Sequence, residues 1–165
     1  MNKLKEKYAD EIQKTFEKYP PDQERSAVMA LLYMAQREHG YVDIHMINDI
    51  AELVGITSTE VAAIIGFYTL YHDEKAGKIR IQVCTDLPCA LRGADKFLAD
   101  LCSALGIQPG ETTPDGLITI EAVMCLAACD KAPMFQAQTC DGIEYHENMT
   151  VEKTMALVDE WRKKE

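Results

Sequence analysis

Cys84-Thr-Asp-Leu-Pro-Cys89 and Cys125-Leu-Ala-Ala-Cys129 begin and end the stretch around which this chain is organised. Four residues separate the cysteines of the first pair, three separate those of the second, and 35 residues lie between the two pairs. Two close pairs that a folded unit brings together make a site of four thiolates. The sequence therefore poses the question of what such a site holds.

The positions of these cysteines favour an iron-sulfur cluster. Such clusters need thiolate ligands, because sulfur donors suit iron and disperse its charge. The first pair lies between a predicted strand end and a predicted helix N-terminus, where backbone N–H groups favour a thiolate. In the second pair, the small residues Ala127 and Ala128 let the backbone approach the sulfides and donate N–H bonds. The predicted ligands of a 2Fe-2S cluster are Cys84, Cys89, Cys125 and Cys129.

Other chemistries for the cysteines stay open at this point. Structural zinc is the main alternative, although zinc sites more often have two-residue gaps and a domain with an ample apolar core hardly needs one. Disulfides are disfavoured in a reducing cytosol, and thiol-disulfide exchange would prefer a single Cys-x-x-Cys pair. Of the two remaining cysteines, Cys102 is expected to be a buried structural thiol and Cys140 a free surface thiol in a hairpin turn.

Composition bounds the class of protein. The chain has 165 residues, of which 47% are hydrophobic, enough for one medium domain or two small ones with a buried core. The formal net charge is −10, and the acidity is even, with 13 acidic and 8 basic residues through Gly77 and 14 and 9 beyond it. Without a basic patch, we expect no nucleic-acid partner. Because no apolar run approaches the roughly 20 residues of a membrane helix, we expect no membrane insertion.

The first ten residues bear on location. They are too polar for a signal peptide and carry acids, unlike a mitochondrial presequence. We therefore expect a cytoplasmic protein. In a reducing cytosol, six cysteines indicate metal or redox chemistry more than disulfides.

Residues 1–75 have the pattern of a small helical bundle. Apolar side chains at every fourth position predict a first helix that ends at Pro20-Pro21. Asp22 and Asp43 are expected to cap the second and third helices. Thr57-Ser-Thr-Glu60 has the form of a capping box at the start of a fourth.

Residues 76–165 follow the order strand, helix, strand, strand, strand, helix. The pattern of apolar residues and turn formers predicts the strands over 79–83, 117–123, 134–138 and 143–146. Helices are expected after Pro88 and after Thr150, and Asp141-Gly142 predicts a hairpin. This order is typical of a thioredoxin-like layout. The predicted fold class is α+β, with an N-terminal helical bundle followed by a thioredoxin-like domain with a mixed sheet and flanking helices.

Several motifs together resemble a known family, and the resemblance covers nearly the whole chain. The motifs outside the cysteine pairs are Ala35-Gln36, Gly40-Tyr41, Gly66-Phe-Tyr-Thr69, Leu91-Arg-Gly93 and Gly110-Glu-Thr-Thr-Pro-Asp-Gly116. With the cysteine pairs, the chain is similar to the small iron-sulfur subunit of the NADH-oxidising module of respiratory complex I, a thioredoxin-like 2Fe-2S ferredoxin family also found in NAD-linked hydrogenases and formate dehydrogenases. The family commonly has glycine where this chain has Ala127, a difference that strains the loop if its backbone needs a positive φ.

The resemblance implies an electron relay. A larger flavoprotein subunit would bind NADH and FMN, and this chain would carry single electrons on its 2Fe-2S cluster as a subunit of the enzyme NADH:quinone oxidoreductase, peripheral to the cytoplasmic face of the inner membrane. No Gly-rich turn follows a strand in this sequence, so FMN and NAD are expected on the partner. Residues 1–75 would supply much of the docking surface, and residues 76–165 the ferredoxin domain. The equivalent subunit of a hydrogenase or formate dehydrogenase, a free electron carrier and a zinc-stabilised interaction module are the alternatives.

Overall fold

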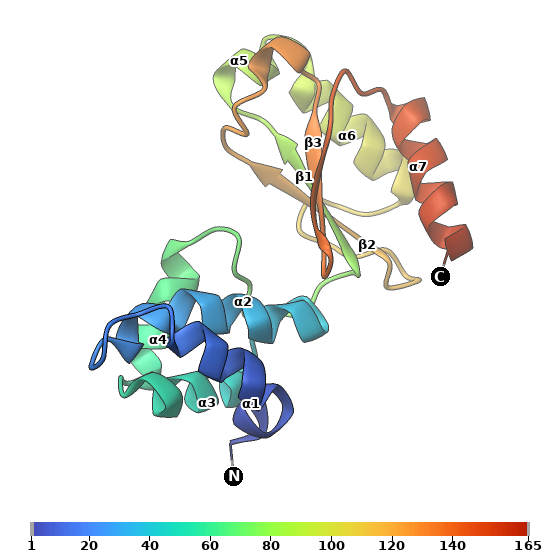
Figure 1. Ribbon diagram of the computed structural model, residues 1–165. Coiled ribbons are helices and arrows are strands. Elements are labelled where there is room, and N and C mark those ends of the chain that lie inside the picture. Colours follow the sequence, from blue (N-terminus) through green and yellow to red (C-terminus); the bar gives the residue numbers. More distant parts are fainter. Residues whose placement is uncertain (1, 165) are drawn as a thin grey trace. The chain divides into compact units, whose positions relative to one another are not determined.

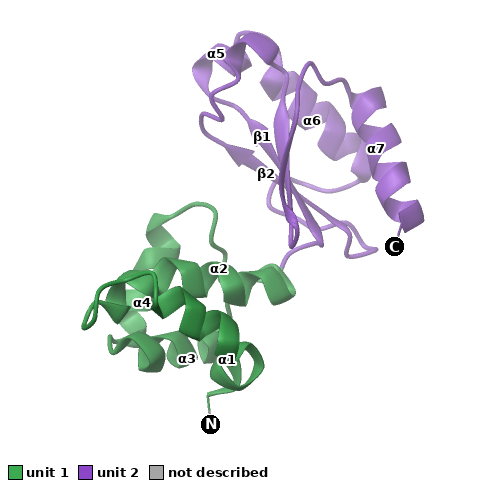
Figure 2. Ribbon diagram, viewed as in Figure 1, with its two compact units in different colours: residues 1–75 green, residues 76–165 purple. Residues whose placement is uncertain are grey.

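The computed structural model describes residues 2–164, and the chain forms two compact units, residues 1–75 and residues 76–165 (Figure 2). Each unit has a hydrophobic core of its own. Within residues 2–164, no single helix has the length and apolar character to cross a membrane, and the pair Ile44–Val54 and Ser58–Phe67, bent by 114°, passes that test only when its two helices are taken together.

Unit 1 is a helical bundle (Figure 1). Its elements are α1 (Lys3–Phe16), the 3-10 turn η1 (Glu24–Ala27), α2 (Val28–His39), α3 (Ile44–Val54) and α4 (Ser58–Phe67). The apolar sides of these helices meet in one core, in which Leu31, Leu32, Ile50 and Val61 are fully buried. Removal of this surface from water is the main contribution to the stability of the bundle.

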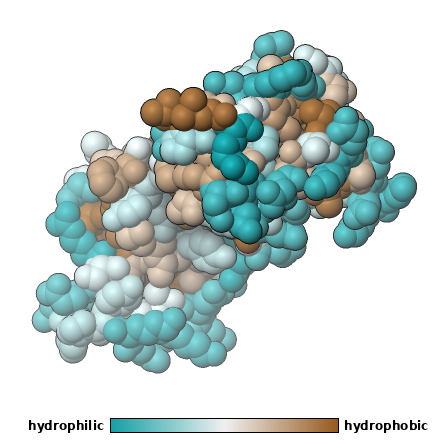
Figure 3. Space-filling view, turned by 90° about the horizontal axis from the view of Figure 1, so that it is seen from above, coloured by the Kyte–Doolittle hydropathy of each residue, from teal (hydrophilic) through white to brown (hydrophobic). Residues whose placement is uncertain are grey.

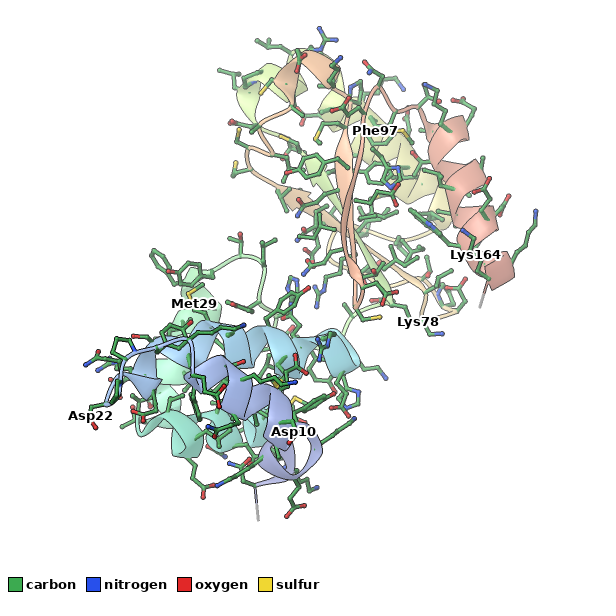
Figure 4. All side chains as sticks on the ribbon, in the orientation of Figure 1. Asp10, Asp22, Met29, Lys78, Phe97 and Lys164 are labelled. Atoms are coloured by element: carbon green, nitrogen blue, oxygen red, sulfur yellow. The ribbon has the colours of Figure 1, made fainter. Side chains whose placement is uncertain are left out.

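Two of the three caps predicted in unit 1 are confirmed. Asp43 accepts a hydrogen bond of 2.8 Å from the N–H of Met46. The capping box of Thr57 and Glu60 is complete in both directions. The predicted cap at Asp22 is wrong, because Asp22 lies in the loop with φ +66° (Figure 4), and α2 follows η1 without a side-chain cap. Aspartate is among the few residues that enter the left-handed region readily, so Asp22 serves as a turn residue instead.

Unit 2 is a four-stranded mixed sheet with helices packed on it (Figure 1). Its elements are β1 (Ile79–Cys84), α5 (Leu87–Ala90), α6 (Ala94–Leu105), β2 (Ile118–Val123), η2 (Cys129–Lys131), β3 (Phe135–Thr139), β4 (Gly142–His146) and α7 (Val151–Lys164). The strand order is β2-β1-β3-β4, with β1 and β2 parallel and the other pairs antiparallel. A parallel pair needs a crossover, which α5 and α6 supply, whereas β3 and β4 form the predicted hairpin. The α+β prediction is confirmed.

The unit 2 core lies between the sheet and its two long helices. Phe97 of α6 (Figure 4) stacks against Phe135 of β3, with ring centroids 6.5 Å apart, and α7 adds the fully buried Val158. Val83 belongs to this core, but Cys84 packs in a separate small cluster. Since successive side chains of a strand point to opposite faces, the end of β1 turns Cys84 away from the main core.

Candidate metal centre

Three of the four predicted ligands lie together at one end of the unit 2 sheet. Cys84 ends β1 and Cys89 lies in α5, and both are buried, with exposed fractions of 1% and 0%. Cys129 begins η2 and is half-buried. The Cys89 thiol interacts with the thiols of both Cys84 and Cys129. We call the buried residues around these thiols the thiol cluster, which consists of Cys84, Cys89, Ala94, Ala132 and Met134.

Backbone contacts fix the first cysteine pair. The N–H of Cys84 donates to the carbonyl of Met134 at 3.3 Å, and that of the next residue, Thr85, donates to the carbonyl of Val123 at 2.9 Å, so the end of β1 is held by β2 and by the residue just before β3. Asp86 then starts α5 and accepts a hydrogen bond of 2.8 Å at its carbonyl from the N–H of Cys89. The residues between the two cysteines, with Pro88 in the first turn of α5, thus fix the backbone positions from which both thiols project.

Cys125 differs from the other three predicted ligands in that it is exposed. It follows β2 in a loop, its side chain is exposed, and its Sγ accepts a hydrogen bond of 3.4 Å from the N–H of Ala127. Within residues 2–164, no group of three or more His, Cys, Asp or Glu side chains forms a ready-made site for one metal ion. A 2Fe-2S cluster spreads its four thiolates over two irons, so Cys125 would complete the ligand set from the exposed loop.

The backbone of this loop is strained at Ala127. Its φ is +58°, in the left-handed region, which costs an L-residue roughly 1 to 2 kcal/mol. Glycine occupies this region without that penalty. The backbone at Ala127 thus needs a positive φ, which is the condition under which the sequence predicts strain at this residue.

Burial, together with the neighbouring thiols of Cys84 and Cys129, raises the pKa of the Cys89 thiol to about 12. At neutral pH the metal-free protein therefore keeps this proton, and metal binding would release it. All six cysteines are free. Sulfur donors, two of them buried, are the donor set that an iron-sulfur cluster takes, so the residues present fit the predicted cofactor.

The two cysteines outside the site lie where the sequence predicts. Cys102 is buried in α6, and burial raises the pKa of its thiol, with a smaller contribution from Glu111. Cys140 is exposed in the turn between β3 and β4. Both are consistent with the structural and surface interpretations.

Exposed apolar side chains, which were not among the predicted site residues, lie beside the cysteines. Leu87, Leu91 and Met124 have exposed fractions of 69%, 81% and 76%, and each lies within two residues of a predicted ligand. Figure 3 shows large hydrophobic side chains at the surface among hydrophilic ones. The sequence contained a signal for this exposure, because these apolar residues lie next to the predicted ligands and do not belong to the apolar pattern of α6.

The fold and the site define a thioredoxin-like protein with a thiolate site, and comparison with known proteins agrees with this class. The family described as "Thioredoxin-like [2Fe-2S] ferredoxin" matches residues 12–162. NADH-quinone oxidoreductase subunit 2 of Thermus thermophilus is 45% identical over 127 residues, which is 77% of this chain and 70% of the relative. A subunit of the NADH-quinone oxidoreductase of Rhizobium meliloti is 37% identical over 153 residues, covering 93% of this chain and 88% of the relative. The chain belongs to the thioredoxin-like 2Fe-2S ferredoxin family, and the resemblance drawn from its motifs is confirmed.

A solved structure supports the fold. An NAD+-reducing [NiFe]-hydrogenase in the air-oxidised state matches with a TM-score of 0.67 and 18% identity. The match covers 81% of this chain and 23% of the hydrogenase chain, so this chain spans about a quarter of the length of that chain. At this level of identity, the likeness concerns the fold.

Proposed function

We propose that this chain is the 2Fe-2S electron-carrier subunit of an NADH-quinone oxidoreductase. The observation that carries the proposal is the meeting of Cys84, Cys89 and Cys129 at one end of a thioredoxin-like sheet, with Cys125 one loop away. Membership of a 2Fe-2S family and the names of the relatives, which are subunits of NADH-quinone oxidoreductases, support it. Bound to these four thiolates, the cluster supplies one-electron redox chemistry.

The residues of this chain would serve the cluster in two ways. The buried thiols of Cys84 and Cys89 would keep water from one side of it, since neither residue has more than 1% of its surface exposed. On the other side, the N–H of Ala127 points at the sulfur of Cys125. Hydrogen bonds to cluster sulfurs and solvent exposure both tune a reduction potential. The Cys125 side is thus the side open to a redox partner.

NADH and FMN belong, in this proposal, to a flavoprotein partner. No Gly-rich turn follows a strand of this chain, so a nucleotide has no phosphate-binding turn here. The exposed apolar side chains of Leu87, Leu91 and Met124 support contact with another protein close to the cluster. The complex would lie at the cytoplasmic face of the membrane, with this chain as a peripheral subunit. The same site would serve a hydrogenase or formate dehydrogenase, and the flavoprotein that copurifies with the chain distinguishes these assemblies.

The cofactor is tested by metal and sulfide analysis of the anaerobically purified chain. We expect a brown protein with about two irons and two sulfides per chain, lost in Cys84→Ala and in Cys129→Ala. Cys140→Ala is the matched control, because it removes an exposed thiol outside the site and should leave colour and iron content unchanged. A colourless protein with one bound zinc would instead support a structural adaptor.

The proposed roles of the two units, docking for unit 1 and cluster binding for unit 2, are tested by deletion. We propose that unit 1 supplies much of the docking surface, since Tyr33, Phe67 and Leu70 are exposed on it, with fractions of 54%, 76% and 46%. Unit 2 has its own core and all six cysteines. Deleting residues 1–75 should therefore abolish association with the flavoprotein and leave a coloured unit 2. Loss of colour with association intact would contradict this assignment.

A further inference from the structure

Arg92 joins the two cysteine segments. It is the third residue after Cys89, and its Nε–H donates at 3.3 Å to the carbonyl of Ala132, which is the third residue after Cys129. The N–H of Arg92 donates to the carbonyl of Cys89 at 3.0 Å, and that of Ala132 to the carbonyl of Cys129 at 3.4 Å. One side chain therefore connects the turn that carries one ligand to the turn that carries another.

The Arg92 side chain is exposed, and the backbone at both ends of the contact is held by neighbouring contacts. Ala132, with an exposed fraction of 4%, belongs to the thiol cluster, and so does Ala94, which begins α6 two residues after Arg92. Gly93 makes this arrangement possible, because its φ of +91° turns the chain from α5 into α6. The hydrogen bond from Arg92 to Ala132 therefore holds the Cys89 segment and the Cys129 segment at a fixed distance from each other.

Arg92 also differs from the other arginines in the described chain, residues 2–164, by its partner. Each of the others forms an ion pair with a carboxylate, and these pairs are Arg25–Glu60, Arg37–Glu11, Arg80–Glu121 and Arg162–Asp115. Arg92 donates to a carbonyl, and no described carboxylate lies within ion-pair distance of it. A 2Fe-2S cluster with four thiolates has a net charge of roughly −2, and reduction adds one negative charge. A cation beside the site that has no carboxylate partner therefore stabilises the negatively charged cluster, and it stabilises the reduced form more than the oxidised form.

We propose that Arg92 is a positioning residue of the cluster site, which clamps the Cys89 segment to the Cys129 segment and holds a positive charge beside the cluster. The inference rests on the proposed 2Fe-2S cofactor. A guanidinium suits both tasks, because it is always charged and its N–H donors have a fixed planar geometry that a lysine lacks.

Three variants of the full chain test the clamp and the charge separately. Arg92→Gln removes the charge, and Arg92→Lys keeps the charge but lacks the Nε–H donor. Lys96→Gln is the matched control, because it removes one positive charge one turn along α6, where Lys96 forms an exposed ion pair with Asp100. The two measurements are the rate of iron loss to a chelator and the midpoint potential of the cluster, followed by electron paramagnetic resonance.

We expect both Arg92 variants to lose iron faster than wild type, by about fivefold, which is the size of effect that one hydrogen bond with a charged donor supports. The midpoint potential should fall in Arg92→Gln and stay near the wild-type value in Arg92→Lys. A general loss of packing would not separate the two variants in this way. Lys96→Gln should match wild type in both measurements.

The outcomes separate this inference from the proposed function. If the wild-type chain is brown but Arg92→Gln matches Lys96→Gln in both measurements, the role of Arg92 is overturned and the cluster stands. A wild-type chain that holds no cluster overturns both. Should Arg92→Gln not fold, Arg92→Lys decides, since iron loss at the wild-type rate would overturn the clamp.

Discussion

The two cysteine segments of unit 2 are built by different means. In the first, a strand end and a short helix bury both Cys84 and Cys89. In the second, Cys125 is exposed and Cys129 half-buried, in a loop that passes through the left-handed region at Ala127. The fold itself therefore positions the first pair, whereas the second pair depends on a loop whose ordering costs conformational entropy.

This difference means that the free-energy cost of forming the metal site falls mainly on the second cysteine segment. Metal binding to a site that is incomplete in the free protein has to order what is missing. Here, Cys125 lies in an exposed loop, whereas the Cys89 thiol already interacts with the thiols of Cys84 and Cys129. Substitutions in the two segments should therefore differ in their effect on the stability of unit 2.

The largest expected effect is on the metal-free protein. Cys89→Ser places a hydroxyl in a fully buried position and should lower the free energy of unfolding of unit 2 by about 1 to 3 kcal/mol. Cys125→Ser changes an exposed side chain and should stay within about 0.5 kcal/mol of wild type. Urea unfolding followed by the fluorescence of Trp161, the only tryptophan, measures both. Equal losses in the two variants would mean that the segments are not built differently.

Local sequence patterns predicted most of the fold, because each helix boundary or strand depends on neighbouring residues. The capping box at Thr57 and the cap at Asp43 are examples. Thr150 likewise begins α7, where its hydroxyl accepts a hydrogen bond from the N–H of Lys153 at 3.3 Å. Asp22 shows the limit of such patterns, because the same residue type suits a cap and a left-handed turn.

The sequence predicts four candidate ligands but not how the fold arranges them. The spacing of the cysteines singles out Cys84, Cys89, Cys125 and Cys129, yet it does not indicate that Cys125 is exposed while Cys84 and Cys89 are buried. That difference depends on contacts between distant segments, such as the hydrogen bond from Cys84 to Met134. The role that we infer for Arg92 depends on another, since its acceptor Ala132 lies 40 residues away. Sequence periodicity does not encode either contact.

A smaller effect is expected from relieving the strain in the second segment. Ala127→Gly should raise the free energy of unfolding by up to about 1 kcal/mol, because glycine occupies the left-handed region without the side-chain clash. Ala128→Gly is the matched control. The φ of Ala128 is −128°, so glycine there brings only extra freedom to the unfolded chain and should destabilise. Equal destabilisation in the two variants would show that Ala127 is not strained.

The smallest effect concerns the sheet that supports the first segment. His146 of β4 stacks on Phe135 with ring centroids 4.8 Å apart, contacts Trp161 edge-on at 5.9 Å, and has a buried Nε2 with no hydrogen-bond partner in the described chain. Burial lowers the pKa of His146 below its usual range, and Glu144, at 3.9 Å, only partly opposes this shift.

Because the folded-state pKa of His146 is lowered, the unfolded chain takes up a proton first as the pH falls below about 6.5. The free energy of unfolding of unit 2 should therefore be highest above that pH and decline toward pH 5. His146→Phe keeps the stacking with Phe135 and should flatten the decline in the metal-free protein. The test is urea unfolding at several pH values with Trp161 as probe, and identical slopes in wild type and variant would place the acid sensitivity of unit 2 elsewhere.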